Sequence, residues 1–358
     1  MVAISGAGAP INIVGAEMGA LRKAAKSVLA PAVRAAWPAV EAMAEIGART
    51  PRLGKTIQWK SRWDAECDSV LAALPAPEGV TRELYRKLVA PADPAKRHAL
   101  VRVNGAPTAL ISLRRRRVYW EPAPYQCLPN FIAPAIDDAA LGRALNALAL
   151  EVRVASGLNL APHAMRARRT HDYEVYQADL TGDYGALWSK KHLSNVRRAR
   201  ERCAGLTHRV DGDGDLRWIL DLWRQNWERD VERETVSADD RLRFWGALMA
   251  AAPAPGRWRA HTITLLDGDK RIAGAVLLSR GETVSFQCAA RDPAHEALSA
   301  GTRVLDFAME WAAQSGFRTF DLGSGDYKKR WAPVGTMRHA AIFRPALTDL
   351  LYRVDPLG

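Results

Sequence analysis

The alternation of apolar and polar positions is clearest in the C-terminal half of the chain. Apolar-rich segments there, separated by turn residues at 267–269 and at Gly281, predict β-strands over residues 173–178, 260–266, 271–279, 283–289 and 317–322. Apolar residues at helical spacing predict helices over 189–203, 216–229, 239–250 and 302–315. Gly316 follows the last of these helices, where a glycine commonly ends a helix. This order of elements indicates an α/β domain with a hairpin-rich sheet.

The first half predicts a smaller α/β unit. We expect strands over 98–103, 109–113 and 117–120, and Asn104-Gly105 between the first two is a hairpin-turn signal. The proline-rich residues 121–134 are expected to form a loop.

A long amphipathic helix should follow this loop. Asp137-Asp138 would cap it and Gly157 would end it. Its apolar face is formed by Leu141, Leu145, Leu148, Val152 and Val154.

The start of the chain adds helices. The alanine-rich residues 16–46, with prolines at 31 and 38, predict one or two helices, and a short helix is expected from residue 65 to about 75. The expected organisation is an N-terminal helical extension (1–75), a first lobe (76–172) and a C-terminal domain (173–358).

Composition narrows the class of protein. The 358 residues are enough for two domains, and no apolar run reaches the roughly 18 residues of a membrane span. The net charge of +12 should attract anions: a phosphorylated cofactor, nucleic acid or an acidic membrane surface. No secretory signal is evident at the start.

The four cysteines lie far apart, at Cys67, Cys127, Cys203 and Cys288. They form no CxxC pair and no cluster with histidine at zinc spacing, so we expect no metal. A reduced, cytoplasmic protein is the simplest interpretation.

The candidate chemistry lies between residues 283 and 329. Ser299-Ala300-Gly301-Thr302 opens the helix that follows the third strand of the series. Glycine lets a ligand approach the backbone closely, and the free amides and dipole of a helix N-terminus suit a pyrophosphate. The structural alternative is a turn that binds nothing.

The string Phe320-Asp321-Leu322-Gly323-Ser324-Gly325-Asp326-Tyr327-Lys328-Lys329-Arg330-Trp331 is similar to a segment of the CelD-like acetyltransferases, a branch of the GNAT superfamily. The basic run from Trp188 to Arg200 also resembles the helix near the start of that domain. The order of elements matches the GNAT core. The fold class implied is α/β, with two GNAT-like lobes of mixed, largely antiparallel sheet flanked by helices, a tandem layout shared with Fem-type aminoacyltransferases.

This resemblance implies a mechanism. GNAT enzymes bind acetyl-CoA or a related thioester in the gap between two core strands, and an amine attacks the thioester directly. A base takes a proton from the amine, an acid can protonate the leaving thiolate, and backbone amides polarise the carbonyl. The pyrophosphate would sit on the backbone amides of Ser299, Ala300, Gly301, Thr302 and Arg303.

The resemblance also implies roles for individual residues, according to their positions in the matching segment. Tyr327 follows the last core strand and is the candidate acid, with a packing tyrosine as the alternative. Asp326 is expected to be a base or to bind a cationic substrate, or else to cap a helix. Lys328 is a candidate phosphate or carboxylate ligand, whereas Lys329 and Arg330 are expected on a solvated face and Trp331 in packing.

One cysteine and two histidines are not expected to take part in catalysis. Cys288 is expected to be a small buried strand residue rather than a nucleophile, because no base is at hand. His261 alternates with apolar residues and is expected to be a core or sheet-face histidine rather than a base, and His295 has no assigned role.

Two basic runs stand apart. In the helix over 189–203, Lys190 and Arg197 are candidates for binding an anionic substrate, and a solvated face is the alternative. The second run is residues 114–117, four arginines on an expected strand.

Three hypotheses for function remain open. The first is an N-acyltransferase that uses acetyl-CoA or another acyl-CoA on a small or polymer-linked amine. The second is aminoacyl transfer from tRNA, which the tandem layout and the positive charge favour. The third is a GNAT scaffold without catalysis that binds nucleic acid or another polyanion.

Overall fold

A computed structural model describes residues 55–74, 79–91, 96–115, 120–122, 152–154, 169–186, 188–231, 238–332 and 334–343. The helices expected over 16–46, the proline-rich loop beyond residue 122, Cys127 and most of the helix expected over 137–157 lie outside these residues.

A single mixed sheet of 12 strands runs through the described chain, in the order β1-β2-β3-β4-β5-β12-β6-β11-β10-β9-β8-β7. Its neighbours pair antiparallel, except for β10 with β11 and β4 with β5. The strands are β1 Lys55–Lys60, β2 Lys96–Val103, β3 Ala106–Arg115, β4 Trp120–Pro122, β5 Val152–Val154, β6 Arg169–Asp179, β7 Thr207–Val210, β8 Arg259–Asp267, β9 Lys270–Arg280, β10 Thr283–Arg291, β11 Thr319–Gly323 and β12 Gly335–Phe343.

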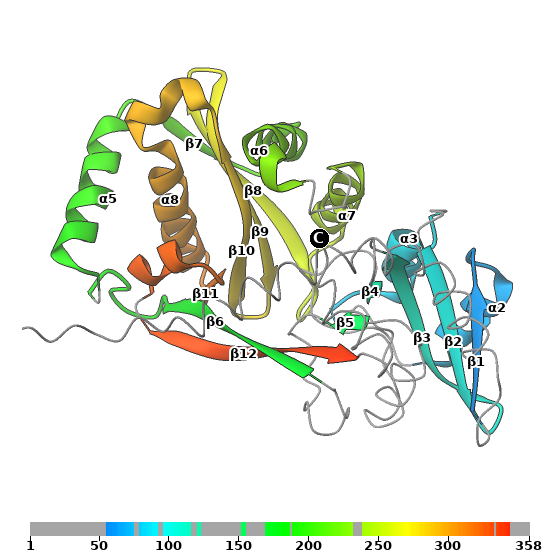
Figure 1. The fold of residues 1–358 in the computed structure, drawn as a ribbon. Helices are drawn as coiled ribbons and strands as arrows, with labels where there is room; N and C mark the ends of the chain where they lie inside the picture. The colour runs from blue at the N-terminus through cyan, green and yellow to red at the C-terminus, as the bar shows by residue number, and fades with distance from the viewer. Residues whose placement is uncertain are drawn as a thin grey trace, which may run out of the picture.

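Helices cover both faces of β8, β9 and β10 (Figure 1). The helix α8 packs on one face with α5 beside it, and α6 and α7 pack on the other. The α-helices are α2 Ala65–Ala73, α3 Arg82–Val89, α5 Lys190–Arg202, α6 Asp215–Val231, α7 Ala238–Ala250 and α8 Ala300–Gln314. Two short 3-10 helices, η1 Pro293–Leu298 and η2 Asp326–Arg330, follow β10 and β11.

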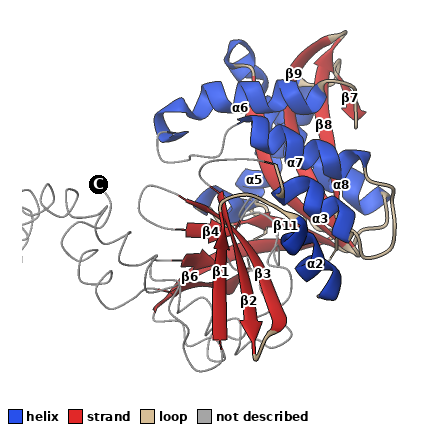
Figure 2. Cartoon of the chain, turned by 90° about the vertical axis from the view of Figure 1, so that its right-hand side faces the viewer, coloured by secondary structure: helices blue, strands red, loops and turns tan. Residues whose placement is uncertain are grey.

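The two faces have separate hydrophobic cores. The core under α8 includes Val304, Met309 and Phe320, all buried. The core under α6 and α7 includes Trp245 and also Tyr85 of α3, so it joins the C-terminal half to the first unit. In this unit α2 packs on β2 and β3, and α3 lies next to α7 (Figure 2).

Local signals placed most of these elements. Asn104 and Gly105 both have positive φ, 51° and 81°, as a two-residue hairpin turn between β2 and β3 requires. Ser189 caps α5, because its hydroxyl accepts a hydrogen bond from the His192 amide at 3.2 Å. Gly316 ends α8 with a φ of 84°. The α/β class with a mixed, largely antiparallel sheet is confirmed.

The end of one predicted helix is wrong. Val152 and Val154 were assigned to the amphipathic helix, but they form β5, which pairs with Ala341 to Phe343 of β12. Alternating β-branched residues suit a strand once a partner strand is present. The apolar spacing alone could not show that partner, because β12 lies almost 190 residues further along the chain.

Four elements were not predicted: β1, α3, β7 and β12. In β1, Trp59 pairs with Ala99 of β2. Thr81 caps α3, its hydroxyl accepting from the Leu84 amide at 3.0 Å. Since β1 and α2 pack with β2 and β3, they belong to the same unit, whereas the expected boundary at residue 75 would separate them. The division into two lobes stays a prediction.

Candidate active site

The parallel pair β10–β11 separates after a short paired segment. Only Thr283, Val284 and Ser285 pair with β11, opposite Thr319 to Asp321. Beyond this point β10 continues to Arg291 along β9, while β11 follows β6 until Gly323 lies opposite Tyr176. Figure 1 shows β10 rising beside β9 while β6 and β12 run across beneath it. We call this divergence the β10–β11 wedge.

A β-bulge lies in β10 at the mouth of the wedge. Phe286 is opposite Leu277 and Cys288 is opposite Val276, so Gln287 is the extra residue. The bulge reverses the direction of the side chains. Phe286 belongs to the core under α8, whereas Cys288 belongs to the core under α6 and α7.

Cys288 is therefore a buried residue of the α6 side, as expected. It forms no disulfide with a described residue, and only 6% of the residue is exposed. A nucleophilic role gains no support from this placement.

The side chain of Lys328 reaches across the wedge. Its Nζ lies 5.8 Å from the centre of the Phe286 ring on β10. The same atom lies 3.3 Å from where a Cβ on Gly323 would stand, at the end of β11. Gly323 has a φ of 73°, a left-handed conformation that glycine adopts without strain. Lys328 thus places a positive charge between the diverging strands.

Tyr327 stands beside Lys328 at the surface of the wedge. The residue is 51% exposed, and its ring centre lies 5.6 Å from Lys328 Nζ. Burial of the hydroxyl group is the cause of a raised pKa for this phenol. Tyr327 therefore keeps its proton at neutral pH.

Asp326 opens η2 next to a second acidic residue. The Tyr176 hydroxyl donates to Glu174 Oε2 at 2.5 Å, and this bond, together with the nearby charge of Asp326, raises the pKa of Tyr176 to about 12. Asp326 itself has no ion pair with a described residue. No helix-capping bond involves it, because the residue before η2 is Gly325 and makes no side-chain cap.

Asp321 is a residue that the sequence interpretation passes over. It lies opposite Ser285 at the last paired position of β10 and β11, and only 6% of it is exposed. Its Oδ1 accepts from the Gly323 amide at 2.7 Å, and its Oδ2 accepts from Gln177 Nε2 at 3.1 Å. In the sequence, an acidic residue between the apolar strand residues Phe320 and Leu322 could have drawn attention to this position.

The N-terminus of α8 lies at the end of the η1 loop. Ser299 has left-handed backbone geometry (φ 56°, ψ 35°), and its carbonyl accepts from the amides of Thr302 and Arg303 at 2.9 and 3.2 Å. Within the described residues, the amides of Ala300 and Gly301 have no such acceptor. Of the five amides predicted to bind pyrophosphate, these two are free to donate.

Two arginines lie close to these amides. Arg202 Nη1 donates to the Ala297 carbonyl at 3.0 Å and to Ser299 Oγ at 3.2 Å. A Cβ on Gly301 would lie 3.8 Å from Arg291 Cδ. The helix dipole and these two side chains make the end of α8 electropositive.

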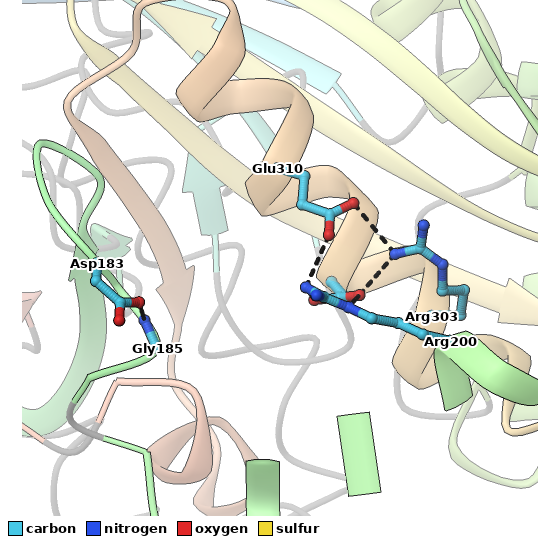
Figure 3. A network of polar contacts seen from close by, with 6 residues as sticks. Asp183, Gly185, Arg200, Arg303 and Glu310 are labelled. Atoms are coloured by element: carbon cyan, nitrogen blue, oxygen red, sulfur yellow. Dashed lines mark hydrogen bonds and ion pairs between the residues drawn. The ribbon is translucent and has the colours of Figure 1, made fainter. Parts of the chain in front are cut away.

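The Arg303 side chain lies along α8 rather than at its N-terminus. Its Nη1 donates to Asp306 Oδ2 at 2.6 Å and to Glu310 Oε2 at 3.2 Å (Figure 3). Arg200 of α5 completes this network with two bonds to Asp306, at 2.8 and 2.7 Å, and one to Glu310 at 2.7 Å. Because Asp306 is fully buried, the network joins α5 to α8.

A pocket of about 770 Å³ lies beside α5. Its wall includes Tyr184, Trp188, Leu193 and Glu310, and also the predicted substrate ligands Lys190 and Arg197. No residue of β10, β11 or η2 lines it, so it is separate from the wedge.

Aromatic packing fixes the piece of chain between the pocket and the wedge. Trp188 Nε1 donates to the carbonyl oxygen of Trp331 at 2.7 Å, and their rings meet edge to face. His192 packs against both rings. Trp331 is thus a packing residue, as expected.

Residues 190–331 match the family model described as the acetyltransferase (GNAT) domain. This stretch begins with α5 and ends just after η2, so it contains α8 and both strands of the wedge. Residues 190–331 are therefore similar to a GNAT acetyltransferase domain. No curated protein matches the chain. The likeness to the CelD-like branch stays a prediction.

Solved structures resemble the described fold at low identity. FemX has 13% identity and a TM-score of 0.47, over 84% of this chain and 100% of that one. L-PGS from Bacillus licheniformis has 13% identity and a TM-score of 0.48, over 82% and 96%. A tandem GNAT protein from the clavulanic acid biosynthesis pathway has 12% identity and a TM-score of 0.42, over 82% and 99%.

The remaining candidate site residues lie away from the β10–β11 wedge. His261 is a buried sheet-face histidine, as expected: its ring nitrogens lie 3.0 Å from Asp211 Oδ2 and 3.0 Å from Ser279 Oγ. Lys329 and Arg330 are exposed. Residues 116 and 117 of the second basic run lie outside the described residues.

Two general searches were negative within the described residues. No group of three or more His, Cys, Asp or Glu side chains there could hold a metal ion. No helix in that part of the chain is long and apolar enough to cross a membrane.

Proposed function

We propose that this chain is an N-acyltransferase that moves an acetyl or other acyl group from CoA to an amine, and that the reaction takes place in the β10–β11 wedge. The observation that carries this proposal is the separation of the two parallel strands after three residue pairs, with a bulge at Gln287. Backbone groups that leave a ladder at such a point are available to a ligand, because no neighbouring strand uses them.

The donor is proposed to lie from α8 to the wedge. The amides of Ala300 and Gly301 would bind the pyrophosphate, with Arg202 and Arg291 adding positive charge. The thioester end would then lie between β10 and β11, near Lys328. The Arg303 side chain is engaged by Asp306 and Glu310, so it contributes to this site only through its position in α8.

Direct attack needs one base and one acid. The amine nitrogen forms a bond to the thioester carbonyl carbon, and the carbon–sulfur bond breaks. Asp326, which has no ion pair within the described residues, would take the proton of the amine. Tyr327, which holds its proton at neutral pH, would give one to the leaving sulfur. Exchange with water returns both groups to their starting states.

The second candidate is transfer from an aminoacyl-tRNA. The supporting observation is α5: six of its arginines and lysines are exposed, whereas Glu201 is its acidic residue. Such a surface would bind the phosphate backbone of RNA. A scaffold that only binds a polyanion is the third candidate. We also propose a cytoplasmic location, because the three described cysteines form no disulfide with one another.

The deciding experiment measures CoA binding by calorimetry and acyl transfer from labelled acetyl-CoA to a panel of amines. We expect saturable CoA binding and transfer to at least one amine. Lys328→Ala should reduce transfer by about tenfold or more if its charge acts in the wedge. Lys329→Ala is the matched control. Lys329 is exposed, so its substitution should leave the rate of transfer unchanged.

Each alternative predicts a different result. Absence of CoA binding at millimolar concentration, together with salt-sensitive binding and turnover of aminoacyl-tRNA, would favour the second candidate. Polyanion binding without transfer from either donor would favour the third.

A further inference from the structure

The rim of the pocket beside α5 carries two cations, Lys190 and Arg197, that described acidic residues neutralise weakly or not at all. Lys190 has no ion pair or hydrogen bond within the described residues. Arg197 is 76% exposed, and its only acidic neighbour there is Glu201 at 3.6 Å. The exposed pairing is weak, because such surface contacts contribute little. Two cations therefore remain available at one rim of the pocket.

The acidic groups of the pocket are already occupied. Glu310 is bound by Arg200 and Arg303, at 2.7 and 3.2 Å. Asp183 accepts from the Gly185 amide at 2.9 Å (Figure 3). A cationic ligand would have to break these contacts, whereas an anionic ligand would not.

Apolar surface lies between the two cations. Leu193 is 45% exposed and lies one turn after Lys190 and one turn before Arg197 on the same side of α5. Trp188 and Tyr184 also line the pocket, and their rings are 5.7 Å apart. An exposed leucine and two aromatic side chains in the wall of one pocket give an apolar ligand group a surface to bury.

The hydroxyl of Tyr184 adds a polar group to the same pocket. Burial, and then the charges of Asp306 and Glu310, raise the pKa of this phenol to about 12. It therefore remains a hydrogen-bond donor at neutral pH, and no described residue accepts from it.

We propose that this pocket is a second ligand site of the protein, and that it binds an organic phosphate. The phosphate would lie between Lys190 and Arg197, and its apolar or planar body would cover Leu193 and face Tyr184. The volume of about 770 Å³ is in the usual range for a small-molecule site. The site goes beyond the proposed acyl transfer, since its wall includes none of β10, β11 or η2.

The chain offers a matched control for this proposal. Lys191 and Arg198 are exposed neighbours of Lys190 and Arg197 on the same helix, and neither lines the pocket. The double variants Lys190→Ala/Arg197→Ala and Lys191→Ala/Arg198→Ala remove the same charge from α5. Circular dichroism and thermal melts would verify that both variants fold.

Calorimetry without CoA would measure the affinity of each form for AMP, n-hexyl phosphate and inorganic phosphate. We expect AMP or hexyl phosphate to bind at least about tenfold more tightly than inorganic phosphate, because each buries apolar surface. Preference for AMP would indicate a nucleotide as the natural ligand, and preference for hexyl phosphate would indicate an alkyl phosphate such as a lipid headgroup. Lys190→Ala/Arg197→Ala should weaken binding by about tenfold or more, and Lys191→Ala/Arg198→Ala by less than about threefold.

Three results would overturn the proposal. No binding of either organic phosphate at millimolar concentration would exclude the ligand class. Equal losses of affinity in the two double variants would show that binding depends on the overall charge of α5 and not on the pocket. Displacement of the probe by CoA would make the pocket part of the donor site. Since binding is the readout, failure of acyl transfer would leave this test unaffected.

Discussion

Gly301→Asp separates the stability of α8 from its ability to bind an anion. Gly301 lies in the first turn of α8, and a Cβ there would have only Arg291 Cδ within 4 Å, at 3.8 Å. A carboxylate at this position interacts favourably with the positive end of the helix dipole, and aspartate is less flexible than glycine. The free energy of unfolding should therefore stay equal or rise by up to about 1 kcal/mol. The same carboxylate would face the proposed pyrophosphate.

The size of the repulsion follows from Coulomb's law. A charge about 5 Å from a pyrophosphate with two charges costs about 1.7 kcal/mol even at the dielectric constant of water, which is roughly fifteenfold in affinity. Gly301→Asn has nearly the same shape without the charge and should weaken binding by less than about threefold. Higher salt should reduce the difference between the two variants.

The assay is calorimetric titration of CoA into wild type, Gly301→Asp and Gly301→Asn, with urea unfolding of each. We expect loss of CoA affinity in Gly301→Asp alone, with no loss of stability. Equal CoA affinity in the two variants would refute the placement of the pyrophosphate at the N-terminus of α8.

Three further predictions concern the wedge, the helix interface and the first unit. Tyr327→Phe should lower turnover by about tenfold or more while CoA affinity stays within about twofold, because only the hydroxyl is removed; steady-state kinetics with calorimetry would measure both, and unchanged turnover would exclude Tyr327 as the acid. Asp306→Asn should lower the free energy of unfolding by about 2–3 kcal/mol, less than a fully buried pair would lose, because Arg200 is half exposed while Asp306 is buried. Urea unfolding would test it against Arg197→Ala, which should change stability by less than about 0.5 kcal/mol; equal effects would contradict the network's role. Burial lowers the pKa of His98 to about 4, so the folded protein holds this ring neutral. The resulting stability is present above the unfolded pKa of about 6.5 and is lost as pH falls, by about 2 kcal/mol between about pH 7.5 and about pH 5. Unfolding at several pH values would show this slope, and His98→Asn should flatten it; a slope unchanged in that variant would assign the effect to other groups.

Local chemistry made much of the fold predictable. The strands that became β8, β9 and β10 are apolar segments separated by turn residues at 267–269 and at Gly281, and Asn104-Gly105 can adopt the positive φ values that its turn requires. Ser189 caps α5 with its own side chain, and Gly316 ends α8. Each of these signals acts within a few residues, so the chain carries it without its neighbours in space.

Elements that depend on a distant partner were missed or misassigned. β12 and β5 stabilise one another by pairing across almost 190 residues, and neither has a strong local signal. Similarly, β7 is four residues long and is held by β8. For such short strands, pairing decides the structure more than intrinsic preference does.

The candidate site also has a part that the sequence predicts and a part that depends on contacts between distant residues. The sequence alone determined that Tyr327 and Lys328 follow the last core strand, that Gly301 opens a helix, and that α5 is basic, because these are facts of order and local pattern. Only the tertiary structure decided that β10 and β11 part after Ser285, that Lys328 reaches Phe286, and that Lys190 and Arg197 share a pocket.

The bulge at Gln287 shows the physical reason. Residues 284, 286, 288 and 290 are buried in regular alternation, so the pattern predicts one continuous strand face. Yet Phe286 packs under α8 and Cys288 packs under α6, because the extra residue turns the chain over. Both faces of β10 are covered by apolar cores, and the hydrophobic pattern cannot distinguish them. Which face each side chain meets was therefore decided by the pairing of β10 with β9 and by the helices packed on either side.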